Sequence, residues 1–502
     1  MFRLRRPGGG QEPPASVDSA SLDQTPAAEP AGGRQKRGEL PPEMRMTALI
    51  VASALFMQTL DSTVVATALP RMAQVFDVSP VTMNIVITSY LVSLAAFIPA
   101  SGWVADRFGA RQVFRVAIIV FTLASLACSL SSTLAMLIVS RILQGMGGAM
   151  MVPVGRLLLL RRVGKADLVV AMSWLTMPAL FGPVIGPPVG GFLVTALSWH
   201  WIFDINIPIG VLGVVLVSRF IKEDERITAT RFDVIGQVLA GIGMAGLIMG
   251  FSSFGRGALP PALAGGLIAL GLLAALLYLR HARRTPTPLL DVSLLRIPTF
   301  AISVYAGSLF RIGIGSLPFL LPLMLQLGFG LSPLHSGLIT FVSAAGALLT
   351  KPVAKPLLQR LGFRAVLAFN GLLGILFVAM IAAFRPSSPL LVLYGVLLVG
   401  GVFRSLQFTA YNTIAYADIP ENRMSAATSF YSTLQQLSLT LGVTLGAAAL
   451  AVAGLVSGQE RPTLGAFSFA FLVVSVAMLP SVRLALSLPK EAGAELSGHR
   501  VR

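Results

Sequence analysis

The chain consists mostly of long apolar segments separated by short polar loops. Each long segment can cross a hydrocarbon layer of about 30 Å as one helix, because an α-helix rises about 1.5 Å per residue. The pattern therefore predicts an all-α integral membrane protein with fourteen membrane-spanning helices. The expected spans are residues 47–69, 81–103, 113–130, 134–154, 169–197, 201–221, 234–254, 262–279, 300–327, 336–350, 366–384, 390–415, 426–456 and 464–484.

The first 43 residues differ from the rest of the chain. They are rich in Pro, Gly, Ser and Ala, carry charges of both signs and contain no apolar run before Met44. Such a segment cannot bury enough apolar surface to fold, and it lacks the apolar region of a signal peptide. We predict a disordered tail over residues 1–43.

Composition supports the membrane interpretation. The chain is 55% hydrophobic and only 12% charged, with a mean hydropathy of +0.80, whereas soluble domains are about 25% charged. With 1 Cys and 4 scattered His, it offers no disulfide and no cysteine or histidine metal site. It also lacks the glycine-rich phosphate loop of ATPases. We therefore expect no metal, no cofactor and no enzymatic activity.

The net charge of +17 is explained by the side of the membrane on which the basic loops lie. With the N-terminus placed inside, the outer loops hold only Arg71, Arg256, Arg385 and Arg461, and nearly all other Lys and Arg residues fall in inner segments. This bias predicts both termini in the cytoplasm. A nucleic-acid partner is not needed to account for the charge.

Two short patterns occur twice in the chain. Residues 103–114 and 356–367 align at Arg, Gly and Arg, and R-I-L-Q at 141–144 is matched by R-S-L-Q at 404–407. Internal repeats of this kind are a recurring plan of transporters, with the substrate site between the halves. The predicted organisation is a tail (1–43), a six-helix bundle (44–222), a linker with two extra helices (223–296), a second six-helix bundle (297–487) and a tail (488–502).

The loop after the second predicted helix contains Gly102, Asp106, Arg107, Gly109 and Arg111. Gly102 permits a close helix approach, Gly109 permits a tight turn, and Asp106 can pair with an arginine at the membrane edge. The loop is expected to hold the two halves together in one state. The alternative is a solvated basic loop that only sets orientation.

This loop resembles the signature loop of the major facilitator superfamily. Residues 60–70 (L-D-S-T-V-V-A-T-A-L-P) and 141–147 (R-I-L-Q-G-M-G) are similar to motifs of its fourteen-span drug:proton antiporter family, although Ala66 replaces the usual Asn. The predicted fifth helix resembles the family's antiporter motif, whose residues here are Gly182, Gly186, Pro187, Gly190 and Gly191. The resemblance covers about residues 45–487 and implies the major facilitator fold and proton-driven export.

Ionisable residues within predicted helices are candidates for proton coupling, since burying a charge in a membrane is costly. Asp61 is the leading candidate for the titrating carboxylate, with Arg141 and Gln144 beside it. Asp204 is an alternative acid near the membrane interface. Arg141 could instead have a fixed structural role.

The second half contains arginines and amides within spans but no acid, which favours an anionic or hydrogen-bonding solute. Alternatively, an arginine there caps helix carbonyls or balances Asp61. The candidate substrate-binding residues are Gln58, Arg311, Gln326, Arg404, Gln407, Asn412 and Gln435.

The sequence as a whole predicts a proton-coupled antiporter that exports drugs or other small toxic compounds across a bacterial cytoplasmic membrane. Organic anions or anionic metal chelates are the alternative substrates, and a nutrient facilitator is a third interpretation. The expected partners are a small-molecule substrate, protons and the lipid bilayer, and a monomer is expected.

Overall fold

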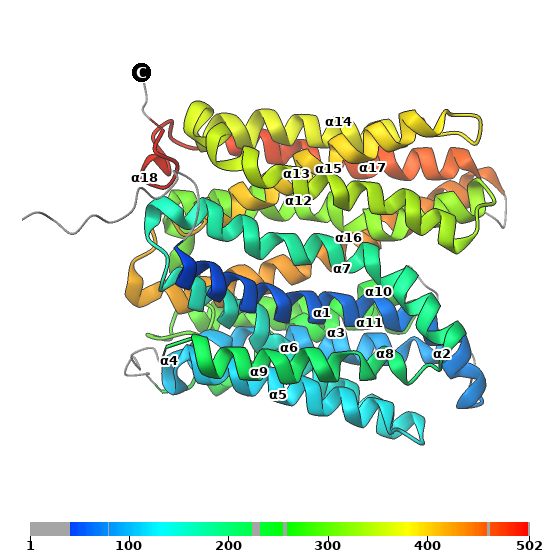
Figure 1. Cartoon of the computed structure of the whole chain (residues 1–502), viewed down its shortest axis with the longest axis horizontal. Helices are drawn as coiled ribbons and strands as arrows, with labels where there is room; N and C mark the ends of the chain where they lie inside the picture. Colours follow the sequence, from blue (N-terminus) through cyan, green and yellow to red (C-terminus); the bar gives the residue numbers. More distant parts are fainter. Residues whose placement is uncertain (1–40, 79, 223–230, 255–258, 459–461, 500–502) are drawn as a thin grey trace, which may run out of the picture. The chain divides into compact units, whose positions relative to one another are not determined.

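The computed structural model describes residues 41–499 except for 79, 223–230, 255–258 and 459–461, so the predicted N-terminal tail lies almost wholly outside the described residues. The described chain forms helices joined by short loops (Figure 1). The α-helices are α1 (Pro42–Val75), α2 (Pro80–Met83), α3 (Ile85–Phe97), α4 (Ser101–Phe108), α5 (Ala110–Ser129), α6 (Leu134–Leu160), α7 (Leu168–Ala196), α8 (Trp201–Asp204), α9 (Asn206–Phe220), α10 (Val234–Phe254), α11 (Pro261–Ala282), α12 (Pro298–Leu323), α13 (Pro333–Ala365), α14 (Gly371–Ile381), α15 (Leu390–Ile414), α16 (Met424–Ser457), α17 (Leu464–Leu486) and α18 (Ala494–Ser497).

The prediction of an all-α membrane protein is confirmed. Within the described residues, 12 helices are long and apolar enough to cross a membrane. The two other expected spans are helical as well: residues 336–350 lie in α13, where they form a shorter apolar helix, and residues 169–197 lie almost entirely in α7. Several side chains of α7, including that of Pro187, lie outside the described part.

The long helices run roughly parallel, with α1 to α9 of the first half together and α12 to α17 of the second half together (Figure 1). The aligned loop glycines have the same unusual backbone, with φ of 87° at Gly109 and 73° at Gly362. Side chains with a Cβ rarely adopt this region. Glycine at the same place in both halves therefore supports the internal repeat.

Of the two extra helices, α11 is largely exposed on its outer side, but α10 packs against both halves. Gln237 of α10 donates a hydrogen bond to the carbonyl of Ala96, at 2.8 Å. Further along α10, Met244 and Ile248 pack with Leu437 of α16. Helix α10 therefore links the two halves.

Helices α1 and α7 approach closely along a stripe of glycines. A Cβ added at Gly182, Gly186 or Gly190 would lie 2.2, 2.0 or 2.3 Å from the hydroxyl of Thr59, Thr63 or Thr67 respectively. Both sets of residues recur every four positions, so they form matching stripes on the two helices. The Thr63 hydroxyl also donates to the Gly182 carbonyl, at 3.1 Å.

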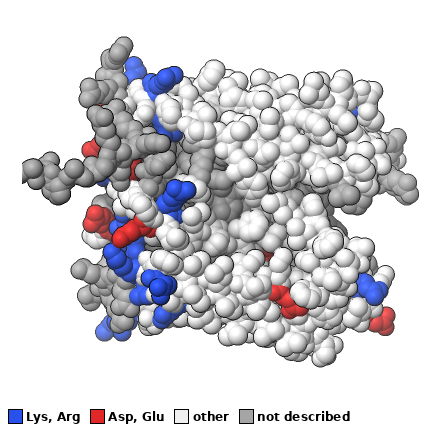
Figure 2. Space-filling model, viewed as in Figure 1, with Lys and Arg blue, Asp and Glu red and all other residues white. Residues whose placement is uncertain are grey.

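Lys and Arg side chains gather at one end of the helices, which we call the basic end (Figure 2). It comprises the loops after α4, α6 and α11 and the segment that includes α18. The C-terminal segment is folded against the bundle here, since Leu488 and Leu496 are buried. Glu495 pairs with Lys165 of the first half at 2.7 Å, and this hydrogen bond lowers the pKa of Glu495. Because both side chains are exposed, solvent screens the pair, and the buried leucines do more to hold the segment.

The glycine stripe yields a paired prediction. Gly182→Ala should destabilise the protein by about 1–3 kcal/mol, because the new methyl group would overlap Thr59, including its backbone. Gly191→Ala, in the same helix with open space around its Cβ, should leave stability unchanged or raise it slightly. Thermal unfolding of the detergent-solubilised variants, followed by tryptophan fluorescence, measures both. Equal stability of the two variants would contradict this packing.

Candidate functional site

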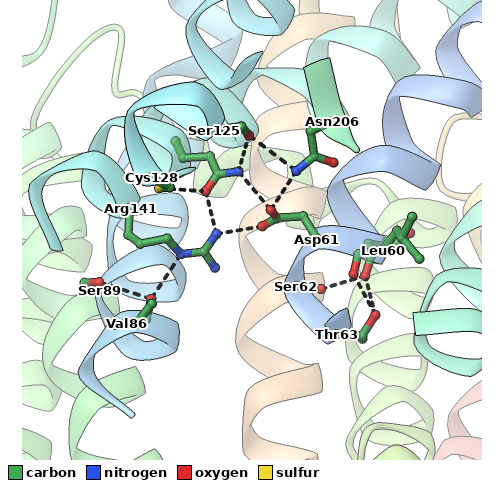
Figure 3. A network of polar contacts seen from close by, with 12 residues as sticks. Leu60, Asp61, Ser62, Thr63, Val86, Ser89, Ser125, Cys128, Arg141 and Asn206 are labelled. Carbon is green, nitrogen blue, oxygen red and sulfur yellow. Dashed lines mark hydrogen bonds and ion pairs between the residues drawn. The ribbon is translucent and has the colours of Figure 1, made fainter. Parts of the chain in front are cut away.

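Asp61 lies at the centre of a buried polar network in the first half (Figure 3). Its carboxylate accepts from Arg141 Nη1 at 2.7 Å, from Gln144 Nε2 at 2.9 Å and from Asn206 Nδ2 at 2.9 Å. Ser125 receives further bonds from Gln144, at 2.7 Å, and from Asn206, at 3.3 Å. The network therefore joins α1, α5, α6 and α9.

Arg141 is fully buried and is held by more than its ion pair. Its Nε donates to the carbonyl of Val86 at 3.1 Å, and its guanidinium lies over the ring of Tyr90, 4.3 Å from the ring centre. Both partners are on α3. The ring faces contribute a favourable cation–π interaction, so the cation is compensated by a carboxylate, a carbonyl and an aromatic ring.

The glycines after Arg141 explain why the arginine reaches these partners. A Cβ at Gly145 would lie 2.7 Å from the Tyr90 carbonyl oxygen of α3, and one at Gly147 would lie 2.8 Å from the Phe121 nitrogen of α5. Only glycine allows α6 to lie this close to both helices. The R-I-L-Q-G-M-G pattern thus supplies both the buried polar side chains and the glycines that let the neighbouring helices come close enough to contact them.

The predicted signature loop is mostly helical, and two of its residues in α4 contact the second half. Asp106 pairs with Arg161 at 2.8 Å and accepts a hydrogen bond from Ser425 of α16. A Cβ at Gly102 would lie 2.7 Å from the Ser425 carbonyl oxygen, so this contact requires glycine. Arg111 donates to the Ser218 carbonyl of α9 at 2.6 Å, whereas Arg107 is exposed.

The structure brings together only part of the predicted substrate-binding set. Arg311 of α12 donates to Asn412 Oδ1 of α15 at 3.2 Å and to the hydroxyl of Tyr431 of α16. Gln435 lies one helical turn beyond Tyr431. These residues form one cluster, to which the sequence analysis did not assign Tyr431.

Other members of the predicted set lie elsewhere. Gln407 is fully buried and bonds to Asn370 and the Leu367 carbonyl, which fastens α15 to the neighbouring helical turn. Gln326 follows Arg311 by fifteen residues, about 22 Å along a helix. Arg404 is half-buried, and its Nε has no hydrogen-bond partner in the described part of the chain.

Gln58 is placed in the first half instead. It lies on α1, three residues before Asp61, and is buried beside Gly148 of α6. It therefore lies near the Asp61 network and apart from the Arg311 cluster.

Arg156 is the functional candidate that the sequence analysis missed, because it was assigned to the inner loop after residue 154. It lies inside α6 and is only 2% exposed. It donates to the Tyr416 hydroxyl at 3.2 Å and to Gln435 Oε1 at 3.1 Å, both in the second half. The four leucines that follow it were the available signal, since they extend the apolar helix to residue 160.

Comparisons with known proteins agree with this architecture. Residues 51–443 match the family model of the Major Facilitator Superfamily. The chain is 40% identical over 445 residues to the putative multidrug resistance protein MdtD of Pectobacterium atrosepticum, covering 88% of this chain and 95% of that protein. It is likewise 40% identical over 450 residues to the protein of the same name from Escherichia coli O6:H1, covering 88% and 94%.

Two solved structures share the fold. The human organic anion transporter MFSD10 aligns with a TM-score of 0.61 at 17% identity, over 89% of this chain and 100% of that one. The proton:xylose symporter XylE aligns with a TM-score of 0.62 at 14% identity, over 90% and 97%. At these identities the likeness concerns the fold alone.

The Asp61–Arg141 pair generates a stability prediction. Arg141→Gln should destabilise the protein by about 3–5 kcal/mol, because it leaves a buried carboxylate without its cation. Combining it with Asp61→Asn should recover most of the loss, since the double variant has no unpaired charge and keeps amide hydrogen bonds. Thermal unfolding in detergent measures the series. A double variant that is no more stable than Arg141→Gln would show that the pair is not coupled in this way.

Proposed function

The chain belongs to the major facilitator superfamily, and we propose that it is a proton-coupled antiporter that exports drugs or other small toxic compounds from a bacterial cytoplasm. The observation that carries the proposal is the buried Asp61–Arg141–Gln144 network, an ionisable acid inside a membrane bundle. Such residues in membrane helices are typical of ion and proton pathways. The multidrug resistance names of the 40% identical relatives support drugs as the substrate class.

The proposed mechanism is alternating access between the two halves. In this structure, polar contacts close the halves at the basic end. Ser429 of α16 donates to the carbonyls of Ile98, at 3.1 Å, and Pro99, at 2.8 Å, and Asp106 joins the same helix through Ser425. We assign the basic end to the cytoplasm from the excess of Lys and Arg there. The structure then corresponds to a state closed toward the cytoplasm.

Protonation of Asp61 is the proposed coupling step. A neutral carboxyl group no longer balances Arg141 and accepts more weakly from Gln144 and Asn206, so α1 is released from α6 and α9. Because α1 is packed along its glycine-facing threonines against α7, a shift of α1 also moves α7. Helix α7 in turn contacts α13 and α15 of the second half. Proton binding can therefore bias the equilibrium between the two states.

The test is transport by the full-length protein in proteoliposomes with an acidic lumen and inside-out orientation. Rhodamine 123, a cationic dye, should accumulate in the lumen of wild-type vesicles only while the pH gradient lasts. Asp61→Asn should abolish this accumulation while still allowing exchange of labelled for unlabelled dye at equal pH, because exchange needs no net proton movement.

Asp77→Asn is the matched control. Asp77 is an exposed acid just beyond α1, and its φ of 51° is tolerated by Asn. It should transport like the wild type. Gradient-driven accumulation that survives Asp61→Asn would exclude Asp61 as the coupling acid, and wild-type dye entry that only equilibrates, at the same rate with and without the gradient, would identify a uniporter.

A further inference from the structure

Helix α6 contains two buried arginines with opposite surroundings. Arg141 pairs with Asp61, whereas Arg156, fifteen residues later, makes no ion pair within the described residues. Its hydrogen-bond partners are neutral: the hydroxyls of Tyr416 and Ser432, at 3.2 and 3.5 Å, and the Gln435 amide oxygen. Among the described residues, the charge of Arg156 is thus balanced by dipoles and not by a carboxylate.

A second buried arginine faces the same aromatic ring. The guanidinium carbon of Arg156 lies 5.3 Å from the centre of the Tyr431 ring, and that of Arg311 lies 4.7 Å from it. Arg311 is also only 2% exposed and makes no ion pair in the described chain; its partners are the Tyr431 hydroxyl and Asn412. Two cations from different halves therefore share one tyrosine.

The positive charges of these two buried arginines are not balanced by a negative charge among the described residues. Burying a charge without a counter-charge is costly, and cation–π contacts and neutral hydrogen bonds offset only part of that cost. Two like charges on one ring also repel each other. The Asp61 network shows how the same helix neutralises a buried arginine, and no described carboxylate does so here.

We propose that Arg156 and Arg311 form a substrate site for organic anions, in which a carboxylate or sulfonate group supplies the missing charge. A guanidinium binds such a group through two parallel N–H donors, and the Nε atoms of both arginines are buried without a partner in the described chain. The rings of Tyr416, Tyr431 and Phe408, which surround the two guanidiniums, suit an aromatic substrate body. This inference rests on the proposed transport function.

The position of Arg156 links such binding to the closure of the basic end. Arg156 belongs to the first half, and Tyr416, Ser432 and Gln435 belong to the second. An anion that takes the donors of Arg156 competes with these three contacts between the halves. Binding of the anion would therefore weaken the closed state, because Arg156 then bonds to the anion and no longer to the second half. Substrate binding and opening of the basic end are coupled in this way.

The test compares two dyes that share a xanthene core but differ in charge. At pH 8, fluorescein is a dianion and rhodamine 123, whose carboxyl group is a methyl ester, is a cation, and equilibrium binding of each to purified full-length protein is followed by fluorescence anisotropy. Wild type should bind fluorescein more tightly than rhodamine 123. Arg156→Gln and Arg311→Gln should each weaken fluorescein binding about tenfold or more, with little change for rhodamine 123.

Two further variants separate recognition from structure. Arg156→Lys keeps the charge but loses the planar fork, so its affinity for fluorescein should fall between those of wild type and Arg156→Gln. If Arg156→Gln fails to fold, the comparison of wild type with Arg156→Lys still tests the site. Arg71→Gln removes an exposed arginine that bonds to Gln74, and it should bind both dyes as the wild type does.

Fluorescein that binds no more tightly than rhodamine 123, or that binds equally to wild type, Arg156→Lys and the Gln variants, would overturn the anion site. Since binding is measured without a gradient, this result is independent of the proton-coupling test. A protein that accumulates rhodamine 123 in a gradient but fails here is an antiporter without the anion site.

Discussion

A single buried ion pair constrains most of the first half. Asp61 and Arg141 meet 2.7 Å apart with no exposed side-chain surface, where leaving either charge without the other would be costly. To satisfy both, α6 must approach α3 and α5 at glycine positions, α9 must supply Asn206, and α1 must place Asp61 at the common centre. Under the proposed coupling, adding one proton to Asp61 would remove the negative charge that this arrangement balances.

The two halves treat buried cations differently. In the first half the guanidinium is neutralised by a carboxylate, which suits a group that exchanges protons. At the junction with the second half, Arg156 and Arg311 face only a tyrosine ring, hydroxyls and amides, which suits a group that exchanges a charged solute. Proton binding and substrate binding would then occupy separate places about 22 Å apart along α6, joined by the rigid helix itself.

Besides the packing of α7 on α13 and α15, the halves are joined by polar contacts at the basic end. Asp106, Arg156 and the C-terminal segment all reach across at the basic end, and each does so through bonds that water or a ligand can replace. By contrast, α1 and α7 are packed along matching stripes of threonine and glycine that leave no room for rearrangement. Strong packing within a half and replaceable polar contacts between halves are what alternating access requires.

The sequence by itself determined the fold class, the helical spans, the repeat and the acid–base core of the first half. These features follow from local physical rules. The length of an apolar segment shows whether it can span the membrane, a charged side chain within a span is costly without a partner, and glycine within a helix allows another helix to approach closely. Asp61, Arg141 and Gln144 were therefore predictable as a group, although Asn206 and Ser125 were not, since ordinary polar residues carry no comparable penalty.

Only the tertiary structure decided which polar residues of the second half lie together. Arg311 bonds to both Asn412 and Tyr431, and Gln435 accepts from Arg156, which lies over the same tyrosine ring. By contrast, Gln407 bonds to another helical turn, and Gln326 lies beyond the end of α12. Arg156 was missed because the predicted span ended at residue 154, although the four leucines after Arg156 extend the apolar helix to residue 160. Its role depends on partners more than 250 residues away in the chain, and a local sequence pattern does not show which distant residues come into contact.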